Sequence, residues 1–172
     1  MITGIELKGT PELARALAGV KANAHLAIGA ALYQEAEAIM ADSKRLVPVD
    51  QGILRNSGFV NPPETYVNET TSGGSGIMVE MGYGGAAPYG LWLHEGTGPA
   101  VGRPAFFPPV APFREWAKRV LGDESLGFVI ARAVGRRGLT PRKFLETPFK
   151  ARAATMLPRL ARRVRGMVER GA

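Results

Sequence analysis

A few side chains in this sequence are of types that could carry catalysis or bind a metal ion. His94 and Glu95 are adjacent and would suit acid–base chemistry or metal ligation. His25 is the only other histidine, so a His-Glu-x-x-His zinc site cannot form. Ser57, His94 and Asp50 supply the residue types of a hydrolase triad, yet no Gly-x-Ser-x-Gly elbow accompanies them. We therefore expect no catalytic residue and no metal site, and a small hydrolase ranks last among the functions considered.

The segment Gly82-Tyr83-Gly84-Gly85 is rich in glycine, as phosphate-binding loops are. It lacks the Gly-Lys-Ser/Thr sequence that follows in such loops, and it does not lead from a strand into a helix. We interpret it as a turn that ends a strand. The chain also has no cysteine, which excludes disulfides, cysteine-ligated zinc and thiol catalysis. The sequence therefore predicts no bound cofactor.

Positive charge is concentrated near the end of the chain. The net charge is +7, and residues 132–170 hold twelve Lys or Arg against only Glu146 and Glu169, a local balance of +10. Such asymmetry predicts an acidic partner, either nucleic acid or the acidic face of another protein. Aromatic side chains that could stack on bases are absent from residues 150–172, which argues against recognition of single strands.

A basic helix is predicted over residues 149–170, with a kink or a break at Pro158. We expect its arginines to lie on one broad face, partly opposite Leu157, Leu160 and Val164. That face is either merely solvated, or it contacts genome DNA or an acidic protein neighbour. Because apolar residues are interleaved with the arginines, we favour protein docking, with interface candidates Arg159, Arg162 and Arg163.

Aromatic residues also gather in a proline-rich segment, residues 99–113. Five prolines exclude regular helix before Pro112, so an extended loop is predicted there. The loop carries Phe106, Phe107 and Phe113, which either fold over their own sheet or reach a neighbouring subunit. Exposed apolar arms are typical of interfaces, so we expect this loop to lie at a subunit interface.

The elements that position these residues follow from the apolar spacing. A long amphipathic helix is predicted over residues 24–46, with Glu35 and Glu37 off its apolar face, and it ends before Pro48. An earlier helix is predicted to start at Thr10. The other predicted elements are a hairpin of strands 66–70 and 77–83, a strand or short helix at 89–95, and helices 113–121 and 126–135.

These elements predict one α+β domain over residues 1–172. A long N-terminal helix packs on a small, mostly antiparallel sheet, and additional helices come from the C-terminal part. No apolar run is long enough to cross a membrane, and residues 1–6 lack the features of a signal peptide. We therefore expect synthesis in the cytoplasm of a host cell and no membrane partner.

Three segments, in this order, resemble one protein family. Residues 41–57, ADSKRLVPVDQGILRNS, resemble a helix end followed by Val-Pro-Val-Asp-Thr-Gly-x-Leu-Arg-x-Ser. Residues 87–98, APYGLWLHEGTG, are similar to a Tyr-Ala motif that ends in Glu, an aromatic residue and Gly-Thr. Residues 140–149, TPRKFLETPF, are similar to Pro-Arg-Pro-Phe-Leu-x-Pro-Ala. The motif positions are Pro48, Asp50, Gly52, Leu54, Arg55, Tyr89, Glu95, Gly96, Thr97, Pro141, Phe144 and Leu145.

Together these motifs resemble the minor tail, or neck, proteins of long-tailed phages, the head–tail joining and tail-completion proteins of lambdoid phages. Gln51 and Gly90 depart from the usual Thr and Ala, and residues 99–125 look like an insertion. The resemblance implies a structural protein of the virion at the head–tail junction, not an enzyme. It implies a homo-oligomeric ring, expected to be a hexamer, that contacts other neck and tail proteins.

The position within that junction stays open among neck, tail-completion and tail-terminator proteins. Within the first motif, Asp50 and Gly52 would form a tight turn after the long helix. Arg55 would pair with Glu95, or both would be solvated charges. The alternative function is a basic DNA-binding accessory protein, in which the C-terminal helix makes non-specific contacts with DNA.

Overall fold

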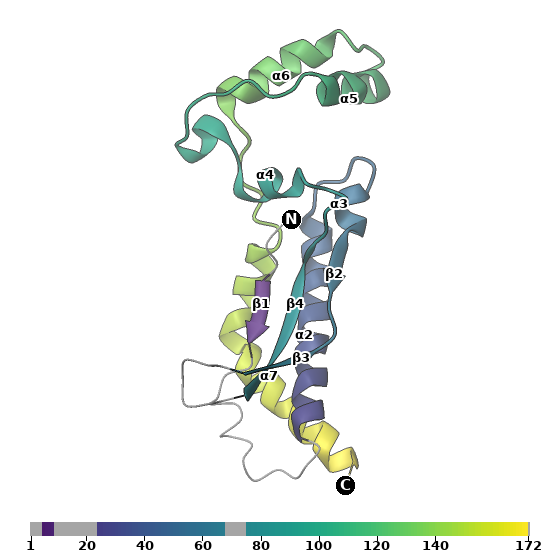
Figure 1. Ribbon diagram of the computed structural model, residues 1–172, viewed down its shortest axis with the longest axis vertical. Helices are drawn as coiled ribbons and strands as arrows, with labels where there is room; N and C mark the ends of the chain where they lie inside the picture. The colour runs from purple at the N-terminus through teal and green to yellow at the C-terminus, as the bar shows by residue number, and fades with distance from the viewer. Residues whose placement is uncertain (1–4, 9–23, 68–74, 172) are drawn as a thin grey trace. The chain divides into compact units, whose positions relative to one another are not determined.

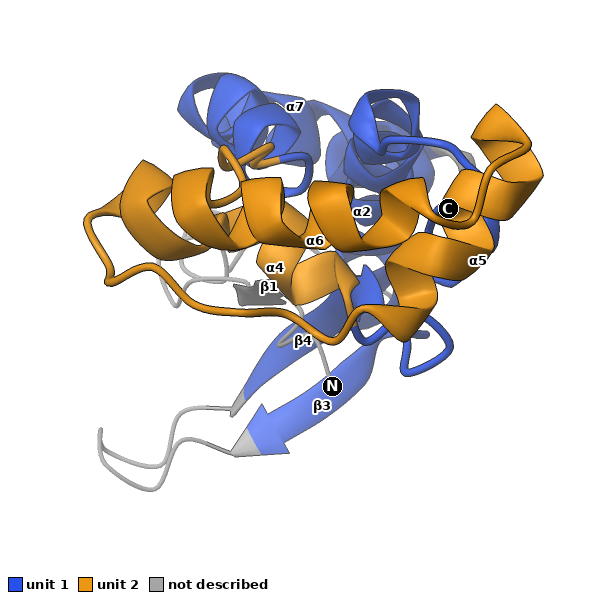
Figure 2. Ribbon diagram, turned by 90° about the horizontal axis from the view of Figure 1, so that it is seen from above, with its two compact units in different colours: residues 1–88, 144–172 blue, residues 89–143 orange. Residues whose placement is uncertain are grey.

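The computed structural model describes residues 5–8, 24–67 and 75–171 (Figure 1). The chain forms two compact units: unit 1 comprises residues 1–88 and 144–172, and unit 2 comprises residues 89–143 (Figure 2). We predicted a single domain over residues 1–172. The structure instead groups the residues between Pro88 and Phe144 into a unit of their own, because they pack mainly on one another. The predicted α+β class is confirmed.

Unit 1 contains a four-stranded antiparallel sheet with its longest strand, β4 (Ser75–Tyr83), at the centre. Strand β1 (Ile5–Lys8) pairs with one edge of β4. Strands β2 (Gly58–Val60) and β3 (Glu64–Val67) pair with successive parts of the other edge. The predicted antiparallel pairing is confirmed for β3 with β4, but β3 begins at Glu64, and residues 68–70 of the predicted first strand lie outside the described residues.

A one-residue bulge separates β2 from β3. Val60 lies opposite Met81, whereas Glu64 lies opposite Met78. The chain therefore advances four residues from β2 to β3 while β4 advances only three, which leaves one extra residue on the β2–β3 side. Pro62 and Pro63, which cannot donate to a ladder, occupy the extra length. Asn61 secures the bulge, because its backbone N–H donates to the Glu80 carbonyl at 2.8 Å and its side-chain amide donates to the Glu80 carboxylate at 2.8 Å.

Two long helices lie on one side of this sheet (Figures 1 and 2). Helix α2 (Ala24–Leu46) matches the predicted range and packs on β4. Along β4 the buried side chains are alternate residues, as expected for one face of a strand: Ile77, Val79, Met81 and Tyr83. Helix α7 (Glu146–Gly171) packs on α2.

Helix α7 begins three residues before the predicted start and runs without a break through Pro158. A split at that proline was therefore a wrong prediction. Of the other predicted elements, the helix starting at Thr10 lies outside the described residues. The segment after the first motif forms a short helix, α3 (Ile53–Asn56), before β2 begins.

Tyr83, the last residue of β4, contacts both α2 and the segment that leads into α7. The side chain is fully buried, and its hydroxyl shares a 2.8 Å hydrogen bond with Ser43 of α2. Its ring meets the edge of Phe144 at a centroid distance of 5.1 Å. Burial raises the pKa of Tyr83 above its usual value, and the Ser43 hydrogen bond partly opposes that rise.

Unit 2 is built from short helices around close backbone contacts. Its elements are α4 (Gly90–Glu95), the 3-10 helix η1 (Gly98–Val101), α5 (Ala111–Leu121) and α6 (Leu126–Arg137). The ambiguous segment 89–95 is thus helical. The predicted helices at 113–121 and 126–135 are confirmed with small extensions. The predicted extended loop 99–113 holds only over residues 103–110, because η1 and α5 occupy its two ends.

Candidate functional site

The first motif forms the turn that was predicted after the long helix. Gly52 has φ 78° and precedes α3, so its backbone is in the left-handed region that favours glycine. Leu54 is buried, whereas Pro48, Asp50 and Arg55 are exposed. The motif therefore positions one core side chain through a glycine turn and leaves its charged groups at the surface.

The second motif lies in unit 2 and holds two distant stretches of that unit together. Thr97 forms an antiparallel bridge with Leu139: the Thr97 N–H donates at 3.0 Å, and the Leu139 N–H donates to the Thr97 carbonyl at 3.2 Å and to its hydroxyl at 3.1 Å. Gly96 has φ 77°, and a side chain there would collide with the Leu139 carbonyl and Pro141. Tyr89 is exposed. The motif residues are thus architectural in unit 2.

Glu95 pairs with Lys143 of unit 2 at 2.5 Å. Its predicted partner, Arg55, belongs to unit 1. That pair stays a prediction. His94 also belongs to unit 2, whereas Ser57 belongs to unit 1 and donates its hydroxyl to the Leu54 carbonyl at 2.8 Å.

The third motif spans the point at which the chain returns to unit 1. Phe144 and Leu145 are buried in unit 1, where the Phe144 ring contacts Tyr83. Pro141 still belongs to unit 2. The motif thus ends unit 2 and starts the packing of α7.

The three aromatic interface candidates lie at or near the surface of unit 2. Phe106 is 42% exposed, Phe107 is 59% exposed and Phe113 is half-buried. The backbone of Phe106 is fixed to α6, because its N–H donates to the Gly135 carbonyl at 3.1 Å. The ring of Phe107 lies 5.9 Å from that of Phe128. These aromatic side chains are therefore presented from a fixed backbone.

None of the fully buried residues of unit 2 is large. Its buried residues are only glycine, alanine and proline: Gly90, Gly96, Gly98, Pro108, Ala117, Gly127, Ala131 and Gly135. Ten of its large apolar residues are instead exposed: Tyr89, Leu91, Trp92, Phe106, Phe107, Val120, Leu121, Leu126, Phe128 and Val129. An apolar surface of this kind is typical of protein interfaces. Unit 2 is therefore the part of the chain best suited to bind another protein.

Two glycines of α6 explain why the helix packs so closely. A Cβ atom at Gly135 would lie 2.0 Å from the Phe106 carbonyl oxygen, and one at Gly127 would lie 2.5 Å from the Arg114 backbone nitrogen. Ala131 lies between them at a spacing of four residues, on the same face of the helix. This small-residue face seats α6 against the backbone, so the bulky residues of α6 must point elsewhere.

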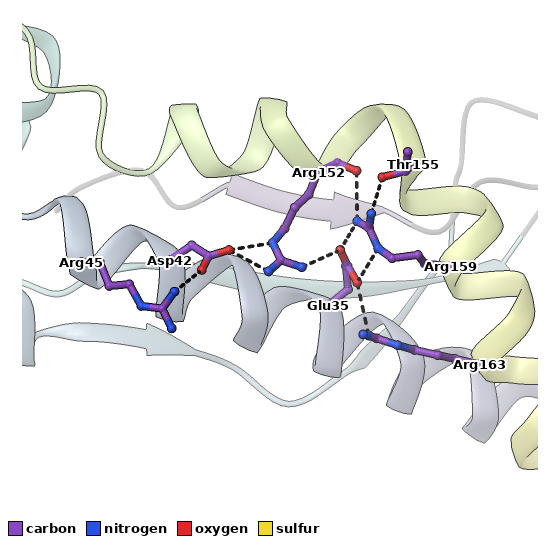
Figure 3. Close-up of polar contacts among 7 residues, drawn as sticks. All are labelled: Glu35, Asp42, Arg45, Arg152, Thr155, Arg159 and Arg163. Atoms are coloured by element: carbon purple, nitrogen blue, oxygen red, sulfur yellow. Dashed lines mark hydrogen bonds and ion pairs between the residues drawn. The ribbon is translucent and has the colours of Figure 1, made fainter.

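A second cluster, in unit 1, joins α2 to α7 through charges. Glu35 is fully buried, and Figure 3 shows the guanidiniums of Arg152, Arg159 and Arg163 around its carboxylate. Arg159 hydrogen-bonds both carboxylate oxygens, Arg163 forms an ion pair at 3.2 Å, and Arg152 approaches to 3.6 Å. Buried carboxylates require such partners, because burial without them penalises the charged form strongly.

Asp42 extends this cluster by two turns of α2. It accepts two hydrogen bonds from Arg152, at 2.9 and 2.7 Å, and one from Arg45 at 3.1 Å (Figure 3). The hydrogen bonds to Asp42 raise the pKa of Arg152 above its ordinary value, and desolvation partly opposes that effect. The α2–α7 contact thus combines charge pairs with the buried Leu160 and Val164.

One prediction about these charges was wrong: Glu35 was placed off the apolar face of the helix, yet it is fully buried. The interface candidates Arg159 and Arg163 both bind Glu35 within the chain and are half-buried, so their contact with a partner stays a prediction. The third candidate, Arg162, is exposed and stays an interface candidate. Among the α7 side chains that the structure describes, Arg165 is the other exposed arginine.

The spacing along both helices contains a signal for this cluster. Glu35 follows Leu32 by three residues and precedes Ile39 by four, so all three share one face of α2. Arg152, Arg159 and Arg163 are separated by seven and four residues, which places them on one face of α7.

No described helix is long and apolar enough to span a membrane. No known protein family, curated protein or solved structure matches the chain.

Proposed function

We propose that this chain is a structural component of a tailed-phage particle, a ring-forming subunit at the head–tail junction. It is not an enzyme in this proposal. Its partners are further copies of itself, expected in a ring of six, together with other neck and tail proteins of the virion. The three sequence motifs, in their order, support the place in the particle, and their residues serve architecture in the two units.

The single observation that carries an assembly role is the composition of unit 2. Its fully buried residues are small, while ten of its aromatic and large aliphatic side chains are exposed. A free monomer gains little from such an arrangement, because the hydrophobic effect favours removal of these side chains from water. Association with another protein removes them, so the arrangement supports a subunit that works in an assembly.

The direct test is the composition of purified particles. We expect the chain to co-purify with virions of the phage that encodes it, at a fixed and small number of copies per particle. Quantitative mass spectrometry of particles purified on a density gradient measures that number. A chain that is abundant in the lysate and missing from the particles would overturn the proposal.

A second candidate, a basic DNA-binding accessory protein, is favoured by the exposed arginines Arg162 and Arg165 of α7. Non-specific phosphate contact requires only such charge and weakens steeply with salt. This candidate is weaker than the first, because Arg159 and Arg163 form ion pairs with Glu35 and so offer less positive charge to DNA. A filter-binding assay on duplex DNA, described in the Discussion, separates the two.

A further inference from the structure

The outward face of α6 has the composition of a binding surface. Phe128, Arg132 and Arg136 are all exposed and recur at every fourth residue, on a face about 100° around the helix from the small-residue face that seats it. Val129 beside them is 61% exposed, and the ring of Phe107 lies 5.9 Å from Phe128. We call these five residues the α6 stripe. Aromatic side chains and arginines are the residues most enriched at the energetic centres of protein interfaces.

The sheet of unit 1 has an acidic face on the side away from its helices. Met78 and Glu80 alternate with the buried residues of β4, so they belong to the face opposite α2 and α7 (Figure 2). Glu64 lies opposite Met78 in register and is exposed, and the ring of Tyr66 lies over Gly76. We call Glu64, Tyr66, Met78 and Glu80 the outer sheet face.

The outer sheet face is also shaped by the bulge between β2 and β3. Asn61 donates its amide to the Glu80 carboxylate at 2.8 Å, which fixes that carboxylate on the sheet. A small pocket lies there, lined by Asn61, Pro62, Glu64, Met78 and Glu80. The face therefore combines two carboxylates with apolar surface, as a partner with arginines and apolar side chains requires.

We propose that the α6 stripe of one copy docks on the outer sheet face of a second copy, with Arg132 and Arg136 meeting Glu64 and Glu80. This inference rests on the proposed function, in which copies of the chain associate, and it names the surfaces involved. Charge decides the pairing. Residues 89–143 hold nine Lys or Arg against four acidic residues, a net +5, so two copies of unit 2 repel each other face to face.

The contact is heterologous, because the two surfaces differ and each copy offers both of them. A heterologous contact repeats from copy to copy and closes into a ring when the rotation allows. The structure thus assigns the donor surface to unit 2 and the acceptor surface to unit 1 of the next copy, and each copy uses both.

Disulfide trapping tests this contact cleanly, because the chain has no cysteine of its own. One copy carries Glu64→Cys and a second, with a tag that changes its mass, carries Arg132→Cys. After mild oxidation of the mixture we expect a linked species that contains one of each copy. The matched control replaces the first variant by Glu37→Cys, at an exposed glutamate of α2, and we expect several-fold less linked product.

Charge exchange gives a second, independent readout by sedimentation velocity at high protein concentration. We expect self-association to be lost in Glu64→Arg/Glu80→Arg and in Arg132→Glu/Arg136→Glu. A mixture of the two variants restores it, because the reversed surfaces complement each other and the unreversed ones still match. Circular dichroism of each variant confirms that the fold is retained, and Glu37→Arg is the control that leaves association unchanged.

The outcomes separate this inference from the proposed function. Two results overturn the docking: Glu64→Cys links no better than Glu37→Cys, or the folded charge variants associate as the wild type does. If the chain is nevertheless found in particles, the virion role stands and another surface joins the copies. If the chain is missing from particles but the mixed disulfide forms, the docking stands and the virion role fails.

Discussion

Glu35 places a carboxylate in the interior of unit 1, with three guanidiniums around it. Glu35→Gln keeps the size of the side chain and removes the negative charge, which leaves Arg152, Arg159 and Arg163 to repel one another. We expect the free energy of unfolding to fall by about 3 kcal/mol, toward the lower end for a broken buried pair because water reaches the guanidiniums. Urea unfolding followed by circular dichroism measures this change.

The matched control is Glu37→Gln, two positions along the same helix at an exposed side chain. That change should alter the stability by no more than about 0.5 kcal/mol. Equal stabilities of the two variants would show that the Glu35 cluster adds nothing to the α2–α7 contact.

Gly52 tests the turn of the first motif. A Cβ atom there would have room, since its nearest neighbour is Asn56 Nδ2 at 3.6 Å, so any cost comes from the backbone conformation. Gly52→Val forces a β-branched residue to φ 78° and should cost about 1–2 kcal/mol or more. Gly52→Asn should cost less, because asparagine tolerates this conformation. Thermal unfolding of the two variants gives the comparison, and a valine variant as stable as wild type would contradict the expected turn.

At the residue scale the sequence predicted single turns better than buried charges. Gly52 and the proline after Val47 are local signals, because they restrict the backbone directly. The burial of Glu35 depends on which face of α2 meets α7, and that is a property of tertiary packing. The spacing of Arg152, Arg159 and Arg163 contained the matching signal, but it gains meaning only when the two helices are known to be neighbours.

Among the elements, α6 depends on Gly127 and Gly135, which let it pack closely on neighbouring backbone. Gly135→Ala would put a methyl group 2.0 Å from the Phe106 carbonyl oxygen, so the helix must move away from residues 103–110. Such overpacking costs about 1–3 kcal/mol. We expect faster hydrogen exchange of the α6 amides, while the amides of α2 and β4 are unchanged. The control is Arg132→Ala on the exposed face of α6, which should not increase exchange. Equal hydrogen exchange in both variants would show that α6 does not need a glycine at position 135.

The long helices were the elements best predicted from sequence. The apolar spacing and Pro48 defined α2 over its full range, because a helix of 23 residues repeats its pattern several times. Pro158 misled the prediction for α7, because the packing of Leu160 and Val164 on α2 offsets the cost of an internal proline. The separation of unit 2 was also missed, because the spacing that predicts its helices does not show which segments they pack on.

Across the whole molecule, the arginines of α7 fall into two groups. Arg152, Arg159 and Arg163 pair with Glu35, whereas Arg162 and Arg165 are exposed. Arg162→Glu with Arg165→Glu reverses exposed groups of α7, and we expect stability within about 0.5 kcal/mol of wild type. If α7 docks on an acidic protein, head–tail joining fails in this variant. Wild-type protein should bind duplex DNA only weakly in a filter assay at about 150 mM salt.

The comparison variant is Arg159→Glu with Arg163→Glu. We expect it to disrupt the packing of α7 on α2, because both side chains bind Glu35. Tight duplex binding by the wild type, lost in Arg162→Glu/Arg165→Glu while joining proceeds, would instead promote the DNA-binding candidate. The positive balance of residues 132–170 was readable from sequence, but its division between fold and surface required the structure.

We propose that this chain joins phage heads to tails, and electron microscopy of lysates shows whether it does. The gene is removed from the phage that encodes it, and the wild-type chain is supplied from a plasmid in a parallel culture. Without the chain we expect DNA-filled heads and free tails as separate products, and with it we expect joined particles. Normal numbers of joined, infectious particles in its absence would show that the chain has no part in joining.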